Sequence, residues 1–192
     1  MSTNVTYGDG VPGDDDLHLL GDVSGGRRVI ELGITRNAVP LARAGGKAIA
    51  VDPDPARIAD LRAEAAAAGL SVECHAGELA DLGFAPSGTI DAVVANHTLD
   101  TDDDLGRTLR QVHRILKPSG PLIVSLAHPF AAVGVGSDAP LRPYGSTGRT
   151  VGDLLAALDR TNFRIEAFHE LGVTKASPVP TTLVLKATKQ GS

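Results

Sequence analysis

Short apolar runs alternate with helical segments along most of the chain, and this alternation limits the fold more than any other feature. Such runs, when stopped by glycine, are typical of buried strands. Strand–helix–strand units form parallel sheets, because a crossover is needed to return the chain to the start of the next strand. The expected strands span residues 29–33, 48–52, 70–74, 90–95 and 121–126, and the expected helices span 38–44, 53–68 and 104–117.

The end of the chain departs from this pattern. A helix is expected at about 150–161, and it is followed by strands at about 163–168 and 182–186 with no helix between them. Two such strands pair as a hairpin, so the last strand is expected to run antiparallel to its neighbour. The sequence therefore predicts an α/β fold with a mostly parallel sheet that closes on an antiparallel strand.

The length of 192 residues fits a single domain. Residues 1–25 are expected to form an N-terminal extension, loose at first and then helical near 17–20. The stretch 127–149 is rich in Gly, Pro and Ser and is longer than most connections in compact domains, which is typical of a lid, a substrate loop or a disordered segment.

Composition excludes several classes of partner. The net charge is −5 and Arg27 and Arg28 are the one pair of adjacent basic residues, which argues against nucleic-acid binding. The apolar runs are too short to span a bilayer. The single cysteine, Cys74, cannot form an internal disulfide, and no basic-then-apolar leader opens the sequence, so a cytoplasmic protein is expected.

Two acidic residues stand at expected strand exits, where open parallel sheets bind ligands. Asp52 lies about 20 residues beyond Gly33, the separation at which an acid can accept hydrogen bonds from both ribose hydroxyls of a nucleoside. Alternatively, Asp52 caps the helix that begins at Pro53, and both roles can hold together. Glu78 follows the third strand, where it could accept from an adenine amine while the N–H of Leu79 meets a ring nitrogen; otherwise it is a solvated loop acid.

Five short motifs follow one another along the chain. They are Glu-Leu-Gly at 31–33, Val-Asp-Pro at 51–53, Gly-Glu-Leu at 77–79, Ile-Asp-Ala-Val-Val-Ala-Asn-His at 90–97 and Leu-Lys-Pro-Ser-Gly-Pro-Leu at 116–122. Taken in order, they resemble the motifs of class I S-adenosylmethionine-dependent methyltransferases over roughly residues 28–130. The resemblance implies a Rossmann-like three-layer sandwich whose seven-stranded, mostly parallel sheet has an antiparallel last strand. It also implies S-adenosylmethionine as cofactor and S-adenosylhomocysteine as product.

The resemblance also assigns roles to individual residues. It places Glu31 and Gly33 near the methionine part of the cofactor and Asp52, followed by Pro53, at the ribose. Glu78 and Leu79 would mark the adenine. Asn96, at the exit of the fourth strand, is a further candidate on the cofactor side.

The first motif departs from the family pattern. The family usually has Asp/Glu-x-Gly-x-Gly-x-Gly there, whereas this chain keeps one glycine, Gly33, and then reads Ile34-Thr35-Arg36-Asn37. Because β-branched residues suit neither positive φ nor close backbone approach, the methionine pocket is expected to be narrowed or closed. Arg36 could bind a carboxylate there or be a surface residue in the first turn of a helix. A nicotinamide-dependent dehydrogenase is disfavoured, since G-x-G-x-x-G is missing after the first strand.

His128 follows the fifth expected strand directly and is the candidate catalytic residue. It could take a proton from a hydroxyl or amine acceptor, although methyl transfer relies mainly on alignment and a base is optional. The alternative is a packing residue whose ring bonds a backbone carbonyl. No metal site is expected, because the histidines share no ligand spacing, and the acidic run 100–104 lacks the glycine and final glutamate of a calcium loop.

Two functions stay open from the sequence. The first is an enzyme that moves the sulfonium methyl to nitrogen, oxygen or carbon of a small molecule. The second is a non-catalytic relative, either an adenosyl-ligand sensor or an interaction partner, which the degenerate glycine loop would explain. A homodimer in which the 127–149 stretch completes a neighbour's pocket is a third alternative.

Overall fold

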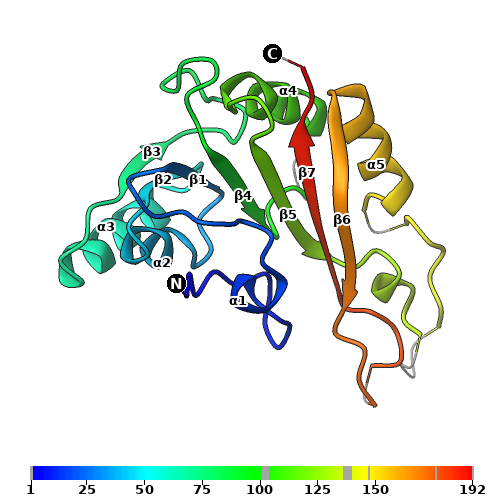
Figure 1. Ribbon diagram of the computed structural model, residues 1–192. Coiled ribbons are helices and arrows are strands. Elements are labelled where there is room, and N and C mark those ends of the chain that lie inside the picture. The colour runs from blue at the N-terminus through cyan, green and yellow to red at the C-terminus, as the bar shows by residue number, and fades with distance from the viewer. Residues whose placement is uncertain (1, 101–103, 136–139, 147, 176, 192) are drawn as a thin grey trace.

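The computed structural model describes residues 2–100, 104–135, 140–146, 148–175 and 177–191, and their strands form one seven-stranded sheet in the order β3-β2-β1-β4-β5-β7-β6 (Figure 1). The strands β1 to β5 pair in parallel, β7 pairs antiparallel with β5, and β6 pairs antiparallel with β7. This confirms the predicted sheet and its closing hairpin. The strands are β1 Arg28–Leu32, β2 Lys47–Asp52, β3 Glu73–Ala76, β4 Ala92–Asn96, β5 Pro121–Ala127, β6 Phe163–Leu171 and β7 Thr182–Lys189.

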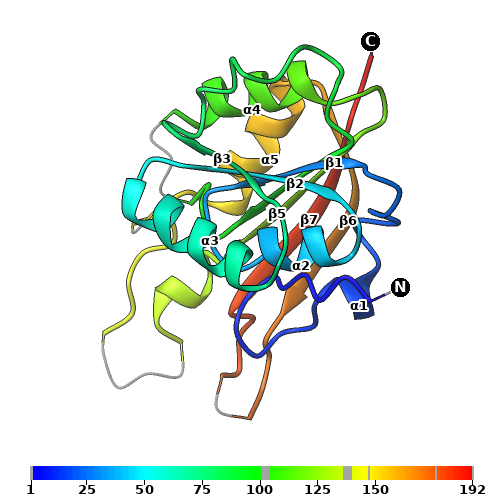
Figure 2. The same ribbon diagram turned by 90° about the vertical axis from the view of Figure 1, so that its left-hand side faces the viewer.

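Helices cover both faces of the sheet, which gives the three layers that were predicted (Figure 2). Side chains alternate along β1, so that Ile30 and Leu32 share a core with α4 and α5, while Val29 faces a second core with α2. A third cluster joins α2 and α3 to β2. The helices are α1 Asp14–Leu17, α2 Ala38–Arg43, α3 Pro55–Ala67, α4 Leu105–Ile115 and α5 Val151–Arg160, with a short 3₁₀ helix, η1, at Ala131–Val133.

The N-terminal segment is not the loose extension that was expected. Val5 and Tyr7 are buried against the same face of the sheet as α2, and the backbone carbonyl of Tyr7 accepts hydrogen bonds from His97 and Ser125. The buried Asp14 accepts from the Tyr7 hydroxyl at 2.7 Å, so burial and this neighbouring carboxylate raise the pKa of Tyr7 above its ordinary value. The apolar residues of this segment have no helical or strand period, which is why the sequence pattern missed their burial.

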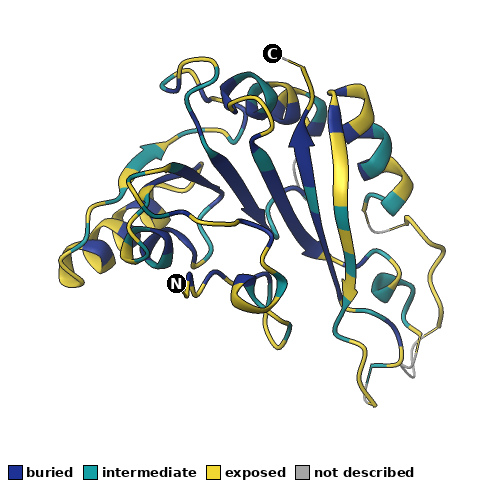
Figure 3. Ribbon diagram, in the orientation of Figure 1, coloured by how far each residue is buried: buried dark blue, intermediate teal, exposed yellow. Residues whose placement is uncertain are grey.

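Some element boundaries also differ from the prediction. The third strand begins at Glu73 rather than Leu70, because Leu70 donates its N–H to Ala65 O and still belongs to the end of α3. The first helix lies at Asp14–Leu17 rather than 17–20. Figure 3 shows that buried residues concentrate in the central strands, whereas β6 at the edge is largely exposed. Among the described residues, no helix is both long and apolar enough to cross a membrane.

The starts of β1 and β4 are tied together by Asp91. Its carboxylate accepts from Arg28 N at 2.8 Å and from Lys117 Nζ at 2.5 Å. Partial burial opposes ionisation of Asp91, but these two hydrogen bonds and the nearby positive charges outweigh it and hold the pKa of the carboxyl below its usual value.

Candidate functional site

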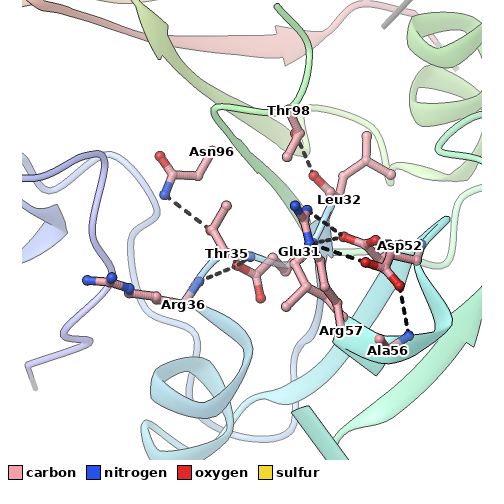
Figure 4. A network of polar contacts seen from close by, with 11 residues as sticks. Glu31, Leu32, Thr35, Arg36, Asp52, Ala56, Arg57, Asn96 and Thr98 are labelled. Carbon is pink, nitrogen blue, oxygen red and sulfur yellow. Dashed lines mark hydrogen bonds and ion pairs between the residues drawn. The ribbon is translucent and has the colours of Figure 1, made fainter. Parts of the chain in front are cut away.

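Glu31, near the end of β1, is fully buried and organises the loop that follows (Figure 4). Its Oε1 accepts from Thr35 N, Thr35 Oγ1, Arg36 N and Asn37 N at 2.8–3.1 Å. Its Oε2 accepts from Ala38 N at 2.8 Å, at the start of α2. One carboxylate therefore binds the unpaired N–H groups of a loop and of a helix N-terminus, where negative charge is stabilising.

Asp52, at the end of β2, is 1% exposed and is bonded on both oxygens. Oδ2 accepts from Ile34 N at 2.7 Å, and Oδ1 accepts from Asp54 N at 2.8 Å. Arg57 on α3 approaches Oδ2 to 3.6 Å and lies above the carboxylate with a 60% exposed side chain. Because an ionised carboxylate has about four acceptor positions, Asp52 keeps capacity for further donors, but Arg57 and the loop after β1 limit access to it.

The alternative in which Asp52 caps a helix beginning at Pro53 is wrong. The helix α3 begins at Pro55, and Asp54 is its N-cap, with Oδ1 accepting from Ala56 N at 2.8 Å. Pro53 itself is exposed between Asp52 and the cap.

Gly33 is required by the backbone of the shortened loop. Its φ is +78°, in the left-handed region, and a Cβ built there would lie 2.2 Å from Thr98 Cγ2. Thr98 is itself fixed by donating to Leu32 O at 2.7 Å. The one glycine that remains in this motif therefore serves both the turn and close packing beneath the loop after β4.

Asn96, at the end of β4, presents an acceptor that has no partner. It is 5% exposed, and its Nδ2 donates to Thr35 Oγ1 at 3.2 Å, which in turn donates to Glu31. Its Oδ1 is buried and makes no hydrogen bond in the structure. A buried unsatisfied acceptor costs about 1–3 kcal/mol, so this oxygen fits a donor supplied from outside the chain.

Glu78 lies at the same edge of the sheet as Asp52. Asp52 pairs with Ala76 of β3, and its carbonyl accepts from Gly77 N at 3.1 Å, so Glu78 follows directly. Its side chain is exposed, whereas Leu79 packs partly against the main core. The structure brings these acids to neighbouring strand ends, but no contact joins Glu78 to Asp52.

Arg36 is a surface residue in this structure, and it pairs with Asp9 at 3.6 Å, with both side chains largely exposed. It lines a cavity of about 250 Å³ together with Glu31, Thr35 and Arg57; neither Asp52 nor Glu78 lines that cavity. Asn37, which precedes α2, makes no side-chain cap; its side chain pairs with the backbone of Thr6.

His128 is 4% exposed and both of its ring nitrogens are engaged. Nδ1 accepts from Phe130 N at 3.1 Å, so Nε2 carries the proton and donates to Glu170 Oε1 at 2.9 Å. The partners are a backbone N–H and a carboxylate, and not the backbone carbonyl named in the alternative to a catalytic role. A catalytic role for His128 stays a prediction and requires one of these two bonds to break.

A second cavity, of about 150 Å³, lies where β5, β7 and α5 meet. It is lined by His128 and by two residues that the sequence did not suggest, Asp100 and Arg149. Asp100 begins the acidic run 100–104, in which no ligand site was expected, but its Oδ1 is buried and lacks a hydrogen-bond partner. Residues 101–103 of that run lie outside the described residues.

Residues 30–124 match the family model described as a methyltransferase domain. The chain is 32% identical over 126 residues to a ubiquinone biosynthesis O-methyltransferase of Azorhizobium caulinodans, covering 61% of this chain and 48% of that protein. It is 29% identical over 124 residues to the protein of the same name from Bradyrhizobium diazoefficiens, covering 62% and 48%. The chain thus spans about half the length of these relatives.

The fold is shared with solved structures. An S-adenosylmethionine-dependent methyltransferase from Mesorhizobium loti superposes with a TM-score of 0.73 at 23% identity, covering 90% of this chain and 95% of that one. This likeness covers more of the chain than the matched residues 30–124, and it confirms the predicted Rossmann-like architecture.

Proposed function

The chain belongs to the class I S-adenosylmethionine-dependent methyltransferases, and from this premise we propose that it binds S-adenosylmethionine and transfers the methyl group to a small-molecule acceptor. The cofactor would lie at the carboxyl edge of β1, β2 and β4, where open parallel sheets bind ligands. The observation that carries the proposal is the unpartnered Oδ1 of Asn96 at this edge.

The hydrogen-bonding groups at this edge match those of the cofactor. Asn96 Oδ1 would accept from the ammonium group of the methionine part, and Asp52 would accept from the ribose hydroxyls. Glu78 and the N–H of Leu79 would meet the adenine. Glu31 and Gly33 would act indirectly, since Glu31 already binds the loop and Gly33 shapes it.

Cofactor binding also requires a change around Asp52. Its Oδ2 is bonded to Ile34 N and covered by Arg57, so the ribose hydroxyls must displace the guanidinium before they reach the carboxylate. The Arg57 side chain is mostly exposed, and an ion pair of this kind contributes about 0–1 kcal/mol. We propose that Arg57 moves into solvent while the loop stays anchored by Glu31.

The catalytic contribution of the chain would be alignment and exclusion of water. When bound, the cofactor supplies an electrophilic methyl group on a sulfonium centre. The rigid loop and β4 would hold the donor, and the acceptor would be held beyond β5, so that the reacting atoms meet in line. His128 remains a candidate for the acceptor side, but its ring is already fixed by Glu170.

The curated relatives are named as O-methyltransferases, which favours a hydroxyl acceptor and gives no support to the non-catalytic alternative. We further propose one cytoplasmic domain of residues 1–192 that acts on a small molecule rather than on nucleic acid or a membrane. The net charge of −5 supports this. Residues 127–149 would cover the acceptor side, either within one chain or in a homodimer.

Isothermal titration with S-adenosylmethionine and S-adenosylhomocysteine tests the proposal. Asn96→Ala and Asp52→Asn are expected to weaken both ligands at least about tenfold, because each removes an acceptor for a ligand donor. Asp60→Asn, an exposed acid on α3, is the matched control and should bind as the wild type does. Absence of heat with either ligand, from wild-type protein shown to be folded by circular dichroism, would refute the proposal.

A further inference from the structure

We propose that the cavity of about 150 Å³ beside Asp100 is the acceptor pocket, that it takes a benzene-sized ring bearing a hydroxyl group, and that Asp100 accepts the hydroxyl proton. This inference rests on the proposed methyltransferase function and adds to it the class of substrate and the proton acceptor.

The size and walls of the cavity point to an apolar ring. An apolar protein cavity of about 150 Å³ is large enough to bind benzene. Leu126 of β5, Leu183 of β7 and Leu154 of α5 form apolar walls, and Ala132 of η1 lines the loop side. Each of the three leucines is at most 6% exposed, so these walls belong to the rigid core and not to a surface loop.

Gly145, which lines the cavity, packs closely against the start of α5. It has a φ of +82°, and a Cβ there would lie 2.8 Å from Thr150 Cγ2. The hydroxyl of the preceding residue, Tyr144, accepts from Val151 N at 3.0 Å. These contacts fix Tyr144 and Gly145 against α5 on this side of the cavity.

Asp100 supplies the polar specificity of the cavity. Its Oδ1 is buried and without a hydrogen-bond partner, although Asp100 lines a space large enough for a ligand. Arg149 donates to Leu99 O at 2.9 Å and to Asp100 O at 3.3 Å, and so holds the turn that carries the carboxylate. A ligand donor is the group that this oxygen lacks.

The same arrangement favours a hydroxyl over an amine as the methyl acceptor. A methyl acceptor needs a free lone pair, and an amine held beside the Asp100 carboxylate would be stabilised as an ammonium group, which has none. A hydroxyl on an apolar ring can donate to the unpaired oxygen of Asp100 and still keep lone pairs for the methyl group. His128 forms part of the wall, but its two ring nitrogens are already bonded, so Asp100 is the better proton acceptor of the two.

The reaction is a displacement at the methyl carbon. The hydroxyl oxygen forms a bond to that carbon, and the carbon–sulfur bond breaks with its electron pair kept by sulfur, so the sulfonium becomes a neutral thioether. The hydroxyl proton passes to Asp100 Oδ1 and then to solvent. The products are an aryl methyl ether, S-adenosylhomocysteine and a proton, which balances atoms and charge.

Two exposed aromatic residues stand next in sequence to residues that line the cavity. Phe130 follows Pro129 and Tyr144 precedes Gly145, and both Pro129 and Gly145 line the cavity. Phe130 and Tyr144 are 42% and 47% exposed, and their ring centroids lie 6.5 Å apart. Exposed aromatic side chains of this kind would suit an apolar substituent on the acceptor.

The test uses phenol, catechol and benzene as probes with the full-length chain. Binding is followed by ¹H–¹⁵N spectra, which report on Gly145 and Ala132, first without cofactor, and methyl transfer to catechol is followed by mass spectrometry. Phenol and catechol are expected to shift these signals and to bind more tightly than benzene. Ala132→Trp, which fills the cavity, should abolish phenol binding and leave S-adenosylmethionine affinity unchanged.

Asp100→Asn separates proton transfer from cofactor binding. It is expected to lower the rate of methyl transfer to catechol by about 100-fold or more, with unchanged cofactor affinity. Asp159→Asn, an exposed acid on the same helix as Leu154, should retain the wild-type rate. A wild-type rate in Asp100→Asn overturns the role of Asp100, and the binding arm stands even if this variant does not fold.

The outcomes also separate this inference from the proposed function. If S-adenosylmethionine binds but none of the three probes does, the acceptor pocket is wrong and the methyltransferase proposal survives. If the probes bind and Ala132→Trp blocks them, but neither adenosyl ligand binds, the pocket stands and the methyltransferase proposal fails. Equal or tighter binding of benzene than of phenol overturns the assignment of a hydroxyl-bearing ligand.

Discussion

Replacing Glu31 by glutamine should destabilise the protein more than any isosteric change on its surface. The substitution keeps the size of the side chain but removes its charge and turns one acceptor oxygen into a donor. In the best rotamer the remaining oxygen stays among the donors of Thr35, Arg36 and Asn37, and the new NH₂ group then faces Ala38 N. The hydrogen bond to Ala38 N is lost, because two donors then face each other. The four hydrogen bonds to the remaining oxygen are kept, but they are no longer made to a charged group.

The magnitude follows from these contacts. An unsatisfied buried donor costs about 1–3 kcal/mol, and hydrogen bonds to a charged group are worth about 1 kcal/mol more than neutral ones. Because the four bonds share one oxygen and are not additive, we expect Glu31→Gln to lower the free energy of unfolding by about 3 kcal/mol. For a domain of this length that corresponds to a fall in Tm of about 6–12 °C.

Urea unfolding followed by circular dichroism measures this loss. The matched control is Glu64→Gln, which makes the same chemical change at an exposed position of α3 and should stay within about 0.5 kcal/mol of wild type. If Glu31→Gln unfolds at the same urea concentration as Glu64→Gln, then Glu31 does not anchor the loop and the account of the first motif is wrong.

Three further variants test other parts of the structure. Arg57→Ala should uncover the aspartate at the end of β2 and raise the affinity for S-adenosylmethionine, measured by isothermal titration, by up to about fivefold. This is the effect of losing a weak ion pair, and a lower affinity would mean that Arg57 contacts the cofactor. Asp91→Asn should lower the free energy of unfolding at pH 7. Because the native pKa of Asp91 is lowered, the difference in free energy of unfolding between variant and wild type should shrink as pH falls below about 4. Urea unfolding at each pH measures this difference, and a pH-independent difference contradicts the prediction. Gly33→Ala should cost about 2 kcal/mol or more, because it combines a strained φ with a clash against Thr98. Adding Thr98→Ser removes the Cγ2 at 2.2 Å but leaves the Cβ at 2.8 Å, so it should recover only part of the loss in thermal melts; full recovery would exclude backbone strain.

The sheet could be predicted because its signals are local. Apolar runs followed by glycine or an acid define most of the strands, and the two closing strands have no helix between them. The packing of Val5 and Tyr7 could not be predicted in the same way, since these residues have no period and their burial depends on a sheet face left uncovered by helices. The boundary at Leu70 was missed because an apolar residue that ends a helix resembles one that begins a strand.

The candidate site was predictable in position but not in bonding. Sequence spacing placed Glu31, Asp52 and Asn96 at strand ends, and the structure has them there. It could not reveal that Ile34 N reaches Asp52, since that contact depends on how far a shortened loop extends. Asp100 escaped notice because an aspartate within an acidic run is usually solvated, and only the fold shows that one of its oxygens is buried.

The shortened loop connects these observations. In this chain the loop's own N–H groups satisfy the two acids at the ends of β1 and β2, with Glu31 bonded to Thr35, Arg36, Asn37 and Ala38, and Asp52 bonded to Ile34. Contacts that stabilise the loop in the absence of ligand oppose its rearrangement. The apparent cofactor affinity is therefore the intrinsic affinity multiplied by the fraction of molecules in which Asp52 is accessible. Asn96 has no such internal partner at its Oδ1, and it is therefore the residue from which the cofactor gains a bond without breaking one.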